Sequence, residues 1–522
     1  MHYPRLRHKY TDLSNPFQAV DRAAPPSDPL PNCSTPAFRV ATRPDACFIN
    51  LMNPTFIRGW LCALTMGLAL FKVAASPLST RQNQCISKAK RFERNGWIYL
   101  HIEGGAQDRG FQHGYLLATE IAQGLNTTRL AWEYRTGMTW PWLVERAAAM
   151  FTSHIDSENL AELDGIAQGV TAVGHPITRN EMIAYNAILE LTGYWWPTEL
   201  KKIKDTPPLA VRESCSSFIA TGKMTHDGNV VLGHNTMMDY YDVLPNVIED
   251  IVPTHGHRIM WQTEPGWIHS GTDFFITDAG LVGSETTIGD FEGFDTNGVP
   301  EFVRMRRATQ DAGSIEQWCG IMKTGNNGGY ANAWLLGDVN SRQIARLELG
   351  LKQVGFEKKA DGFFLGSNVA EDIKLRRFET NEKETDIRTS GVARRVRWKQ
   401  LMKQHAGRID LNLAREFEAD HFDTYLEKQQ PGGRTLCGHF ELQREPAGSW
   451  PGTPFACDGT VDAKAVDASM AKAMSFAARW GSACGRAFDA DKYLSAHPQF
   501  DWMQGLLKSR PSEPWTYFRA GE

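Results

Sequence analysis

Short β-prone segments separated by turn residues fill the part of the chain that follows residue 215. Turn sequences such as Asp227-Gly228, Asp278-Ala279-Gly280 and Asp361-Gly362 lie between them. Connections this short join antiparallel neighbours, because parallel strands need a long crossover. We therefore expect hairpins that pair residues 216–221 with 230–233, 274–277 with 281–282, 331–336 with 343–349, and 356–358 with 363–365.

Helical patterns flank these hairpins on both sides. Apolar residues recur at helical spacing in 114–124, 160–170 and 182–191, where Thr178 is a plausible N-cap, and again in 301–312, 411–419 and 463–478. Residues 97–102 are β-rich, Ser314-x-x-Gln317 is typical of a capping box, and the Lys- and Pro-containing stretch 197–213 is expected to be an exposed loop. Antiparallel sheets with segregated helices predict a layered α+β domain.

The first 75 residues are typical of a leader followed by a signal peptide. Residues 1–51 are polar and Pro-rich, whereas 52–75 combine Arg58, an apolar run over 60–71 and the small residues of 73–75. This layout predicts a secretory signal peptide that starts at Met52 and is cleaved after Ala75. A buried core helix or a retained anchor are the alternatives. We expect a secreted or periplasmic protein, or a lysosomal-type compartment in a eukaryote.

Composition excludes several functional classes. The formal net charge is −4 and no basic stripe suggests nucleic acid. The nine cysteines contain no CxxC pair and no Cys/His zinc spacing, and His255-Gly-His257 is a lone pair without a third ligand. The sequence therefore implies no metal and no organic cofactor. Cys437 and Cys457 could form a disulfide in an oxidising compartment.

Cys215 stands where the polar loop ends and a β-prone segment begins. If the Ser214–Cys215 bond is cut, Cys215 becomes a chain terminus with a free α-amine, whose reference pKa is ~7.7–8.0. Such an amine is partly neutral at neutral pH and can accept the proton of its own thiol. The same thiol can first attack the preceding carbonyl. The ordinary alternative is a small buried hydrophobic residue.

Several motifs resemble the phospholipase B-like proteins. They are Cys215-Ser-Ser, Gly233-His-Asn-Thr236, Thr272–Gly289, Asn327–Trp334, Asn95-Gly-Trp97 and Val461-Asp-Ala-Lys464. Met237 departs from the family pattern, which has Trp there. The 301–312 helix and the modest length are more similar to the related acyl-coenzyme A:6-aminopenicillanic acid acyltransferase-like family. Both resemblances imply the fold of N-terminal-nucleophile hydrolases, a four-layer αββα sandwich of two antiparallel sheets.

The resemblance implies roles for individual residues. Cys215 aligns with the nucleophile, and Asn332 with the asparagine that holds the developing oxyanion; a strand-end turn cap is the alternative for Asn332. His234 and Asn235 are expected to orient the amine or bind substrate, unless they are a structural pair. Four residues are candidate substrate contacts: Thr286, Thr287, Met237 and Trp334. Strand preference explains both threonines equally well, and Trp334 fits a core position better.

These inferences predict a zymogen that cuts itself between Ser214 and Cys215. Residues 76–214 would persist as a small chain associated with a large chain of 215–522. The product would hydrolyse an amide or ester of a small acylated substrate through a thioester. Acyl transfer to an amine acceptor, or a non-catalytic lipid- or partner-binding protein on the same fold, are the alternatives. Arg394 and Arg395 are expected on a solvated helix face, and a contact with a carboxylate or phosphate is the alternative.

Overall fold

The computed structural model describes residues 77–203, 215–241, 246–271, 274–449 and 452–522. The expected leader, the signal peptide and Ser214 lie outside these ranges. None of the described helices combines the length and the apolar character that a bilayer span requires.

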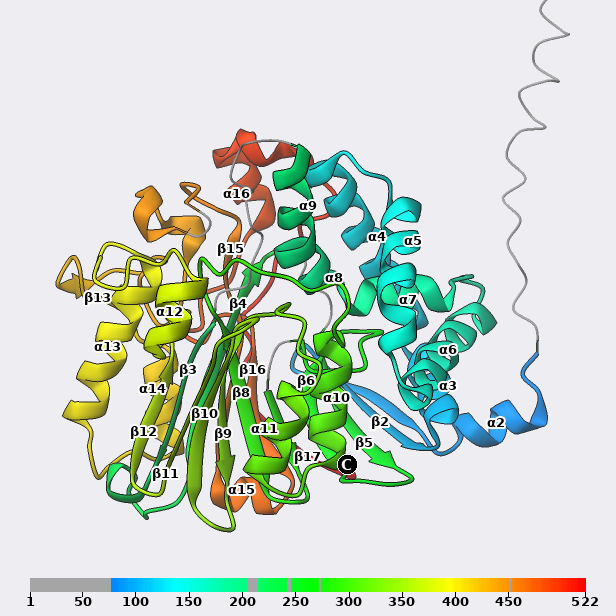
Figure 1. Cartoon of the computed structure of the whole chain (residues 1–522), viewed down its shortest axis with the longest axis horizontal. Helices are drawn as coiled ribbons and strands as arrows, with labels where there is room; N and C mark the ends of the chain where they lie inside the picture. The colour runs from blue at the N-terminus through cyan, green and yellow to red at the C-terminus, as the bar shows by residue number, and fades with distance from the viewer. Residues whose placement is uncertain (1–76, 204–214, 242–245, 272–273, 450–451) are drawn as a thin grey trace, which may run out of the picture. The chain divides into compact units, whose positions relative to one another are not determined.

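Two β-sheets form the centre of the described residues (Figure 1). The larger, nine-stranded within these residues, has the order β1 (Lys90–Arg94), β2 (Trp97–Gly104), β5 (Val247–Pro253), β6 (Ile259–Thr263), β7 (Phe274–Thr277), β8 (Leu281–Thr287), β9 (Asn332–Asp338), β10 (Gln343–Leu349) and β11 (Val354–Lys359). The smaller, six-stranded by the same measure, has the order β12 (Gly362–Gly366), β3 (Ser216–Thr221), β4 (Val231–Asp239), β15 (Asp458–Asp467), β16 (Ser475–Trp480) and β17 (Thr516–Arg519). Neighbouring strands are antiparallel in both sheets, except that β2 and β5 are parallel.

The two sheets pack face to face through apolar side chains. Ile219, Leu232, Leu335 and Phe364 belong to this core and are almost completely buried. A third, two-stranded sheet of β13 (Phe422–Asp423) and β14 (Lys428–Gln429) lies outside it.

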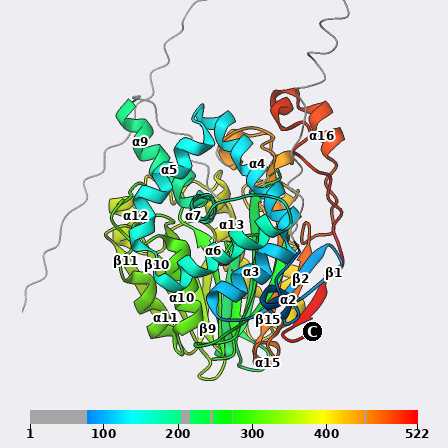
Figure 2. The ribbon, with the colours of Figure 1, turned by 90° about the vertical axis from the view of Figure 1, so that its right-hand side faces the viewer.

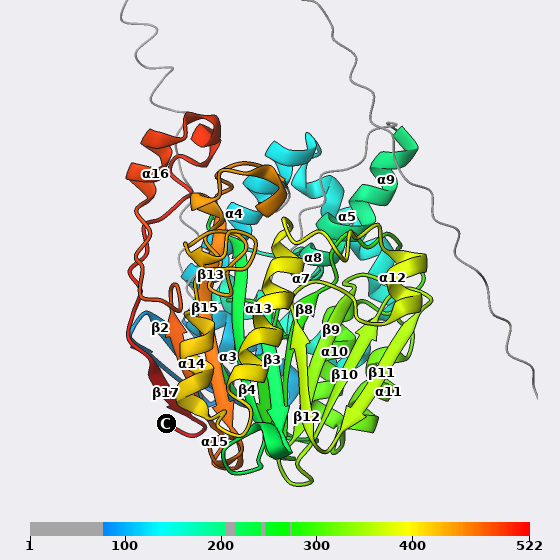
Figure 3. The ribbon, with the colours of Figure 1, turned by 90° about the vertical axis from the view of Figure 1, so that its left-hand side faces the viewer.

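Helices cover the outer face of each large sheet. The nine-stranded sheet is covered by α3 (Ala106–Leu116), α4 (Ala118–Thr136), α5 (Trp140–Phe151), α6 (Ser157–Ala172), α7 (Arg179–Asn186), α10 (Glu301–Asp311) and α11 (Ile315–Lys323) (Figure 2). The six-stranded sheet is covered by α13 (Ser390–Gln404) and α14 (Leu411–Glu418) (Figure 3). The order of layers is therefore helix, sheet, sheet, helix, which confirms the predicted α+β, four-layer αββα sandwich.

Local sequence signals located most elements correctly. Thr178 caps α7 in a capping box with Glu181. At the start of α11 the Ser314 hydroxyl accepts a hydrogen bond from the backbone N–H of Gln317. Strands lie at all the predicted hairpin segments. These signals work because caps and tight turns are determined by neighbouring residues alone.

Three predictions were wrong. Residues 463–478 are not one helix: they form the end of β15, the short helix α15 (Ala468–Lys472) and the start of β16. Ala463 and Ala465 pair with both β4 and β16, and this tertiary pairing outweighs their helix propensity. Asp361-Gly362 does not close a hairpin, since β11 pairs with β10 and β12 pairs with β3 of the other sheet. Residues 197–203 lie in helix α9 (Trp196–Ile203), not in a loop.

Helices α3 and α6 cross at glycines. A Cβ atom added to Gly110 would lie 2.0 Å from the carbonyl oxygen of Glu162, and one added to Gly114 would lie 2.1 Å from that of Ile166. Gly165 and Gly169 of α6 leave equally little room against α3. The backbones of the two helices therefore touch, and no larger residue fits this crossing.

Gly110→Ala should lower the free energy of unfolding by about 1–3 kcal/mol, because the added methyl must push two backbones apart. Gly320→Ala in α11, where a Cβ meets nothing within 4 Å, should raise it by ~0.5–1 kcal/mol. Urea unfolding of both variants measures the two changes. Equal shifts in the same direction would contradict the close crossing.

Candidate active site

Cys215 lies immediately before β3, inside the six-stranded sheet. β3 pairs with β12 on one side and with β4 on the other, so it has no free edge. Cys215 and every residue of β3 are buried. Such a strand can hold a reactive terminus in a fixed position, because both of its neighbours constrain its backbone.

The carbonyl of Cys215 is held by a buried arginine. Arg394 of α13 donates from Nη1 to the Cys215 oxygen at 2.6 Å and from Nη2 to Asn368 Oδ1 at 2.7 Å. Its Nε donates to Ser390 Oγ at 3.1 Å. Burial lowers the pKa of Arg394 to about 10, so the guanidinium remains charged at neutral pH. The prediction that Arg394 lies on a solvated face was wrong, whereas Arg395 forms a partly buried ion pair with Glu371.

Asn368 extends this contact to the other sheet. Its Nδ2 donates to the carbonyl of Thr287 at 2.8 Å, at the end of β8. Thr287 is the register partner of Asn332, the first residue of β9. A continuous series of contacts therefore runs from Cys215 through Arg394 and Asn368 to the strand pair that carries Asn332.

The amide of Asn332 is buried without a hydrogen-bond partner among the described residues. Neither Nδ2 nor Oδ1 makes a hydrogen bond to a described residue, and the side chain is completely buried. An unsatisfied buried polar group costs about 1–3 kcal/mol. The Nδ2 donor is therefore available to a group that none of the described residues supplies. Asn332 does not cap a turn here.

His234 and Asn235 lie beside Cys215 but point to different sides of β4. Their register partners on β3 are Ser217 and Ser216. His234 Nε2 is 2.9 Å from the carbonyl of Glu285 on β8, so Nε2 carries the proton and Nδ1 is a lone-pair acceptor. Burial, together with the nearby Lys464, holds the pKa of His234 well below 6.5, so its ring is neutral.

The Asn235 side chain supports the backbone on the helix side. Its Nδ2 donates to the carbonyls of Glu418 at 2.8 Å and Leu436 at 2.9 Å. This amide therefore holds the end of α14 and the loop at Leu436 against β4, a positioning role.

A buried ion pair connects the two sheets next to His234. Lys464 of β15 pairs with Asp462 and donates to Thr236 Oγ1 at 2.5 Å and to Gln262 Oε1 at 3.1 Å, the latter on β6. Both charged residues are completely buried. Breaking such a pair leaves an uncompensated charge, so these residues are essential to the local geometry.

The candidate substrate contacts fall into two groups. Thr286 lies against Gly366, the residue that pairs with Ser217, and the Thr287 hydroxyl donates to the Tyr330 hydroxyl at 2.9 Å. Both threonines are near the contacts described above. Met237 instead packs with Phe440 and Ala456. Trp334 packs with Trp318 at a ring distance of 4.9 Å and with Phe275, in the core between sheet and helices.

Sequence reasoning assigned Arg394 to the wrong environment, and it missed Asn368 and the pairing of Lys464 with Asp462. A signal for Arg394 was present, since it is four residues before Trp398 and so shares a helix face with the apolar residues of α13. Asn368 has a positive φ of 67° in a loop, and no local pattern marks it. Lys464 belongs to the motif Val461-Asp-Ala-Lys464, but the sequence alone assigned no role to its side chain.

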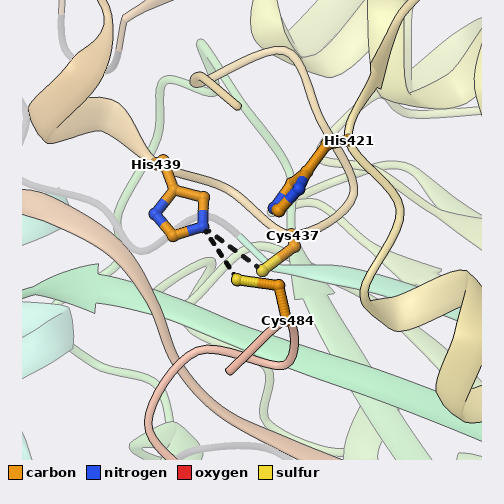
Figure 4. Close-up of side chains that lie close together, drawn as sticks. All are labelled: His421, Cys437, His439 and Cys484. Carbon is orange, nitrogen blue, oxygen red and sulfur yellow. Dashed lines mark hydrogen bonds between the residues drawn. The ribbon is translucent and has the colours of Figure 1, made fainter. Parts of the chain in front are cut away.

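The expected disulfide is not formed. Cys437 and Cys457 are both free thiols. Cys437 lies instead together with Cys484, His421 and His439 (Figure 4). Cys437 and His439 are separated by one residue, but Cys484 lies 45 positions after His439 and His421 lies before the pair, so the spacing matches no common zinc motif.

The site defined by this geometry is a buried cysteine at the head of an interior strand in an αββα sandwich. The sequence model of the family described as Phospholipase B matches residues 150–351. That match includes Cys215, His234, Asn235 and Asn332, and it confirms the resemblance to the phospholipase B-like proteins.

Individual proteins are similar over part of the chain. An uncharacterized protein of Archaeoglobus fulgidus is 23% identical over 268 residues, 48% of this chain and 42% of that protein. The putative phospholipase B-like 2 of Mus musculus is 30% identical over 151 residues, 26% of this chain and 25% of that protein. The chain thus matches less than half the length of either relative. A mutant of the conjugated bile acid hydrolase from Clostridium perfringens is a similar solved structure, with a TM-score of 0.30 and 11% identity over 50% of this chain and 88% of that one.

Arg394→Met should lower the free energy of unfolding by about 3 kcal/mol, because three buried acceptors lose a charged donor. Arg395→Met is the matched control. It removes a partly exposed ion pair and should cost no more than about 1 kcal/mol. Urea unfolding followed by tryptophan fluorescence compares the two. Arg394 would not be a structural anchor of Cys215 if both variants behaved alike.

Proposed function

We propose that the chain is a self-processing acyl hydrolase in which Cys215, freed by scission of the Ser214–Cys215 bond, is the N-terminal nucleophile. One observation carries this proposal: Cys215 directly precedes a buried interior strand, at the end of a segment expected to be cut, and its own carbonyl is held by the guanidinium of Arg394. The names of the phospholipase B-like relatives support acyl-ester hydrolysis as the class of reaction.

Self-processing uses the same sulfur twice. In the first step the Cys215 thiol attacks the carbonyl carbon of Ser214, the peptide bond to the Cys215 nitrogen breaks, and that nitrogen takes the thiol proton. Water then hydrolyses the resulting thioester, so Ser214 acquires a carboxylate and Cys215 regains its thiol. Arg394 holds the carbonyl group of Cys215 in place while its thiol and its nitrogen react, which favours attack by orientation.

Turnover repeats this chemistry on a substrate. The freed amine accepts the thiol proton, and the thiolate attacks the carbonyl of an amide or ester. The buried Asn332 amide supports a role as donor to the oxyanion, because it has no competing partner among the described residues. The ammonium returns its proton to the leaving amine or alcohol, and water resolves the thioester. Since Cys215 is buried, the proposal requires scission to open the site.

Purified protein should give two bands on a denaturing gel, and the Cys215→Ala variant should give one. Cys319→Ser, which changes a buried cysteine in α11, should still give two. N-terminal sequencing should find Cys215 at the start of the larger fragment, and Ser76 at the start of the smaller one if the proposed signal peptide is removed. A single uncut band in all three proteins would overturn self-processing.

Asn332→Ala should lower kcat by ~10²–10³-fold and leave KM nearly unchanged, because an oxyanion donor acts only in the transition state. Asn340→Ala, at the opposite end of the β9–β10 hairpin, should retain normal turnover. The assay uses whichever of N-acyl amino acids, penicillins or lysophospholipids the processed enzyme cleaves. Unchanged kcat in a fully cut Asn332 variant would exclude this role. Transfer of the acyl group to an added amine would identify an acyltransferase.

A further inference from the structure

Two cysteines and two histidines converge beside the six-stranded sheet. His421, Cys437, His439 and Cys484 each offer one ligand atom, and the four atoms lie within 4.8 Å of one another (Figure 4). Cys437 and His439 are almost completely buried, and the other two are half-buried. We infer that these residues form a structural zinc site.

The distances match a tetrahedral centre. His439 Nε2 is 3.6 Å from Cys437 Sγ and 3.5 Å from Cys484 Sγ. With Zn–S bonds of about 2.3 Å and Zn–N bonds of about 2.05 Å at tetrahedral angles, a sulfur and a nitrogen ligand are about 3.6 Å apart. The side chains thus already stand at the separation that a shared zinc ion imposes.

The orientation of His439 also fits a ligand. Its Nδ1 is 2.9 Å from Glu441 Oε1, and Glu441 Oε2 accepts the Tyr240 hydroxyl at 3.0 Å. A carboxylate on Nδ1 fixes the proton there and leaves the Nε2 lone pair aimed at the sulfurs. Metal-binding histidines commonly have this carboxylate partner, because it orients the ring and raises its basicity.

His421 completes the set from another segment. Its ring points toward the two sulfurs, and its Nε2 is buried with no hydrogen-bond partner outside this cluster among the described residues (Figure 4). A disulfide between Cys437 and Cys484 would explain why the two sulfurs are close together. It would not explain why two imidazoles point at them, because disulfide sulfurs have no proton to donate to a ring nitrogen. A metal ion uses all four groups.

The donor set selects zinc and a structural role. Two thiolates with two imidazoles in a tetrahedron suit Zn²⁺, and four protein ligands leave no position for water or substrate. Binding releases the two thiol protons, so the ion and the two thiolates together are neutral.

The ion would fix loops that support the candidate active site. Cys437 and His439 lie in the loop whose Leu436 carbonyl accepts Asn235 Nδ2 at 2.9 Å. Cys484 lies in the turn after β16, and His421 directly precedes β13. Zinc would therefore join three segments behind β4, on the side opposite His234.

The test is metal analysis of the full-length protein purified without added metal. We expect about one zinc per chain by mass spectrometry, and thiolate-to-cobalt absorption near the ultraviolet after replacement by Co²⁺. Cys484→Ser and His421→Ala, at the half-buried positions, should lose most of the zinc. Glu441→Gln should bind it roughly 10–100-fold more weakly. Cys319→Ser is the matched control and should keep its zinc.

Two results would overturn the proposal. One is a Cys437–Cys484 disulfide in the protein as isolated, mapped by peptide mass spectrometry, together with failure of the reduced protein to take up Zn²⁺. The other is a zinc content that neither variant lowers. Should the variants fail to fold, the metal content and cobalt spectrum of the unaltered protein still decide. A chelator that removes the zinc should also lower the melting temperature.

Discussion

The backbone ladder that holds β3 between β4 and β12 is the constraint on which the rest of the site depends. β3 is short, buried on both faces and paired along both edges. The first residues of β3 are therefore held in one backbone conformation, and this also restricts the position of Cys215, which directly precedes the strand. A cysteine placed there has a defined position without needing a loop to hold it, which is what accurate nucleophilic attack requires.

Charged groups complete this arrangement from within the core. Arg394 on one side of β3 and Lys464 near His234 on the other are both buried and both fully engaged with hydrogen-bond acceptors. Burying a cation is expensive unless polar partners surround it. Polar partners meet that cost at both positions, one at the Cys215 carbonyl and the other beside His234.

What the sequence revealed depended on the range of each interaction. The cap at Thr178 and the strand at residue 216 follow from neighbouring residues, and they were predicted correctly. The alanines of β15 were assigned to a helix because their environment is made by β4 and β16, which no local window includes. Asp361-Gly362 was read as a hairpin, since a turn sequence does not say whether the chain returns to the same sheet. Cys215 and Asn332 were named through a resemblance to known proteins, whereas Arg394 was misplaced and Asn368 was not named.

The parallel pairing of β2 with β5 has a consequence for how the chain can be built. β2 comes from the segment before Cys215 and β5 from the segment after it, yet they are neighbours in one sheet along residues 98–104 and 247–253. The covalent connection between the segments is thus redundant once the sheet has formed. A larger segment without β2 would therefore present an unpaired strand edge at β5, and such an edge is a template for pairing with other chains.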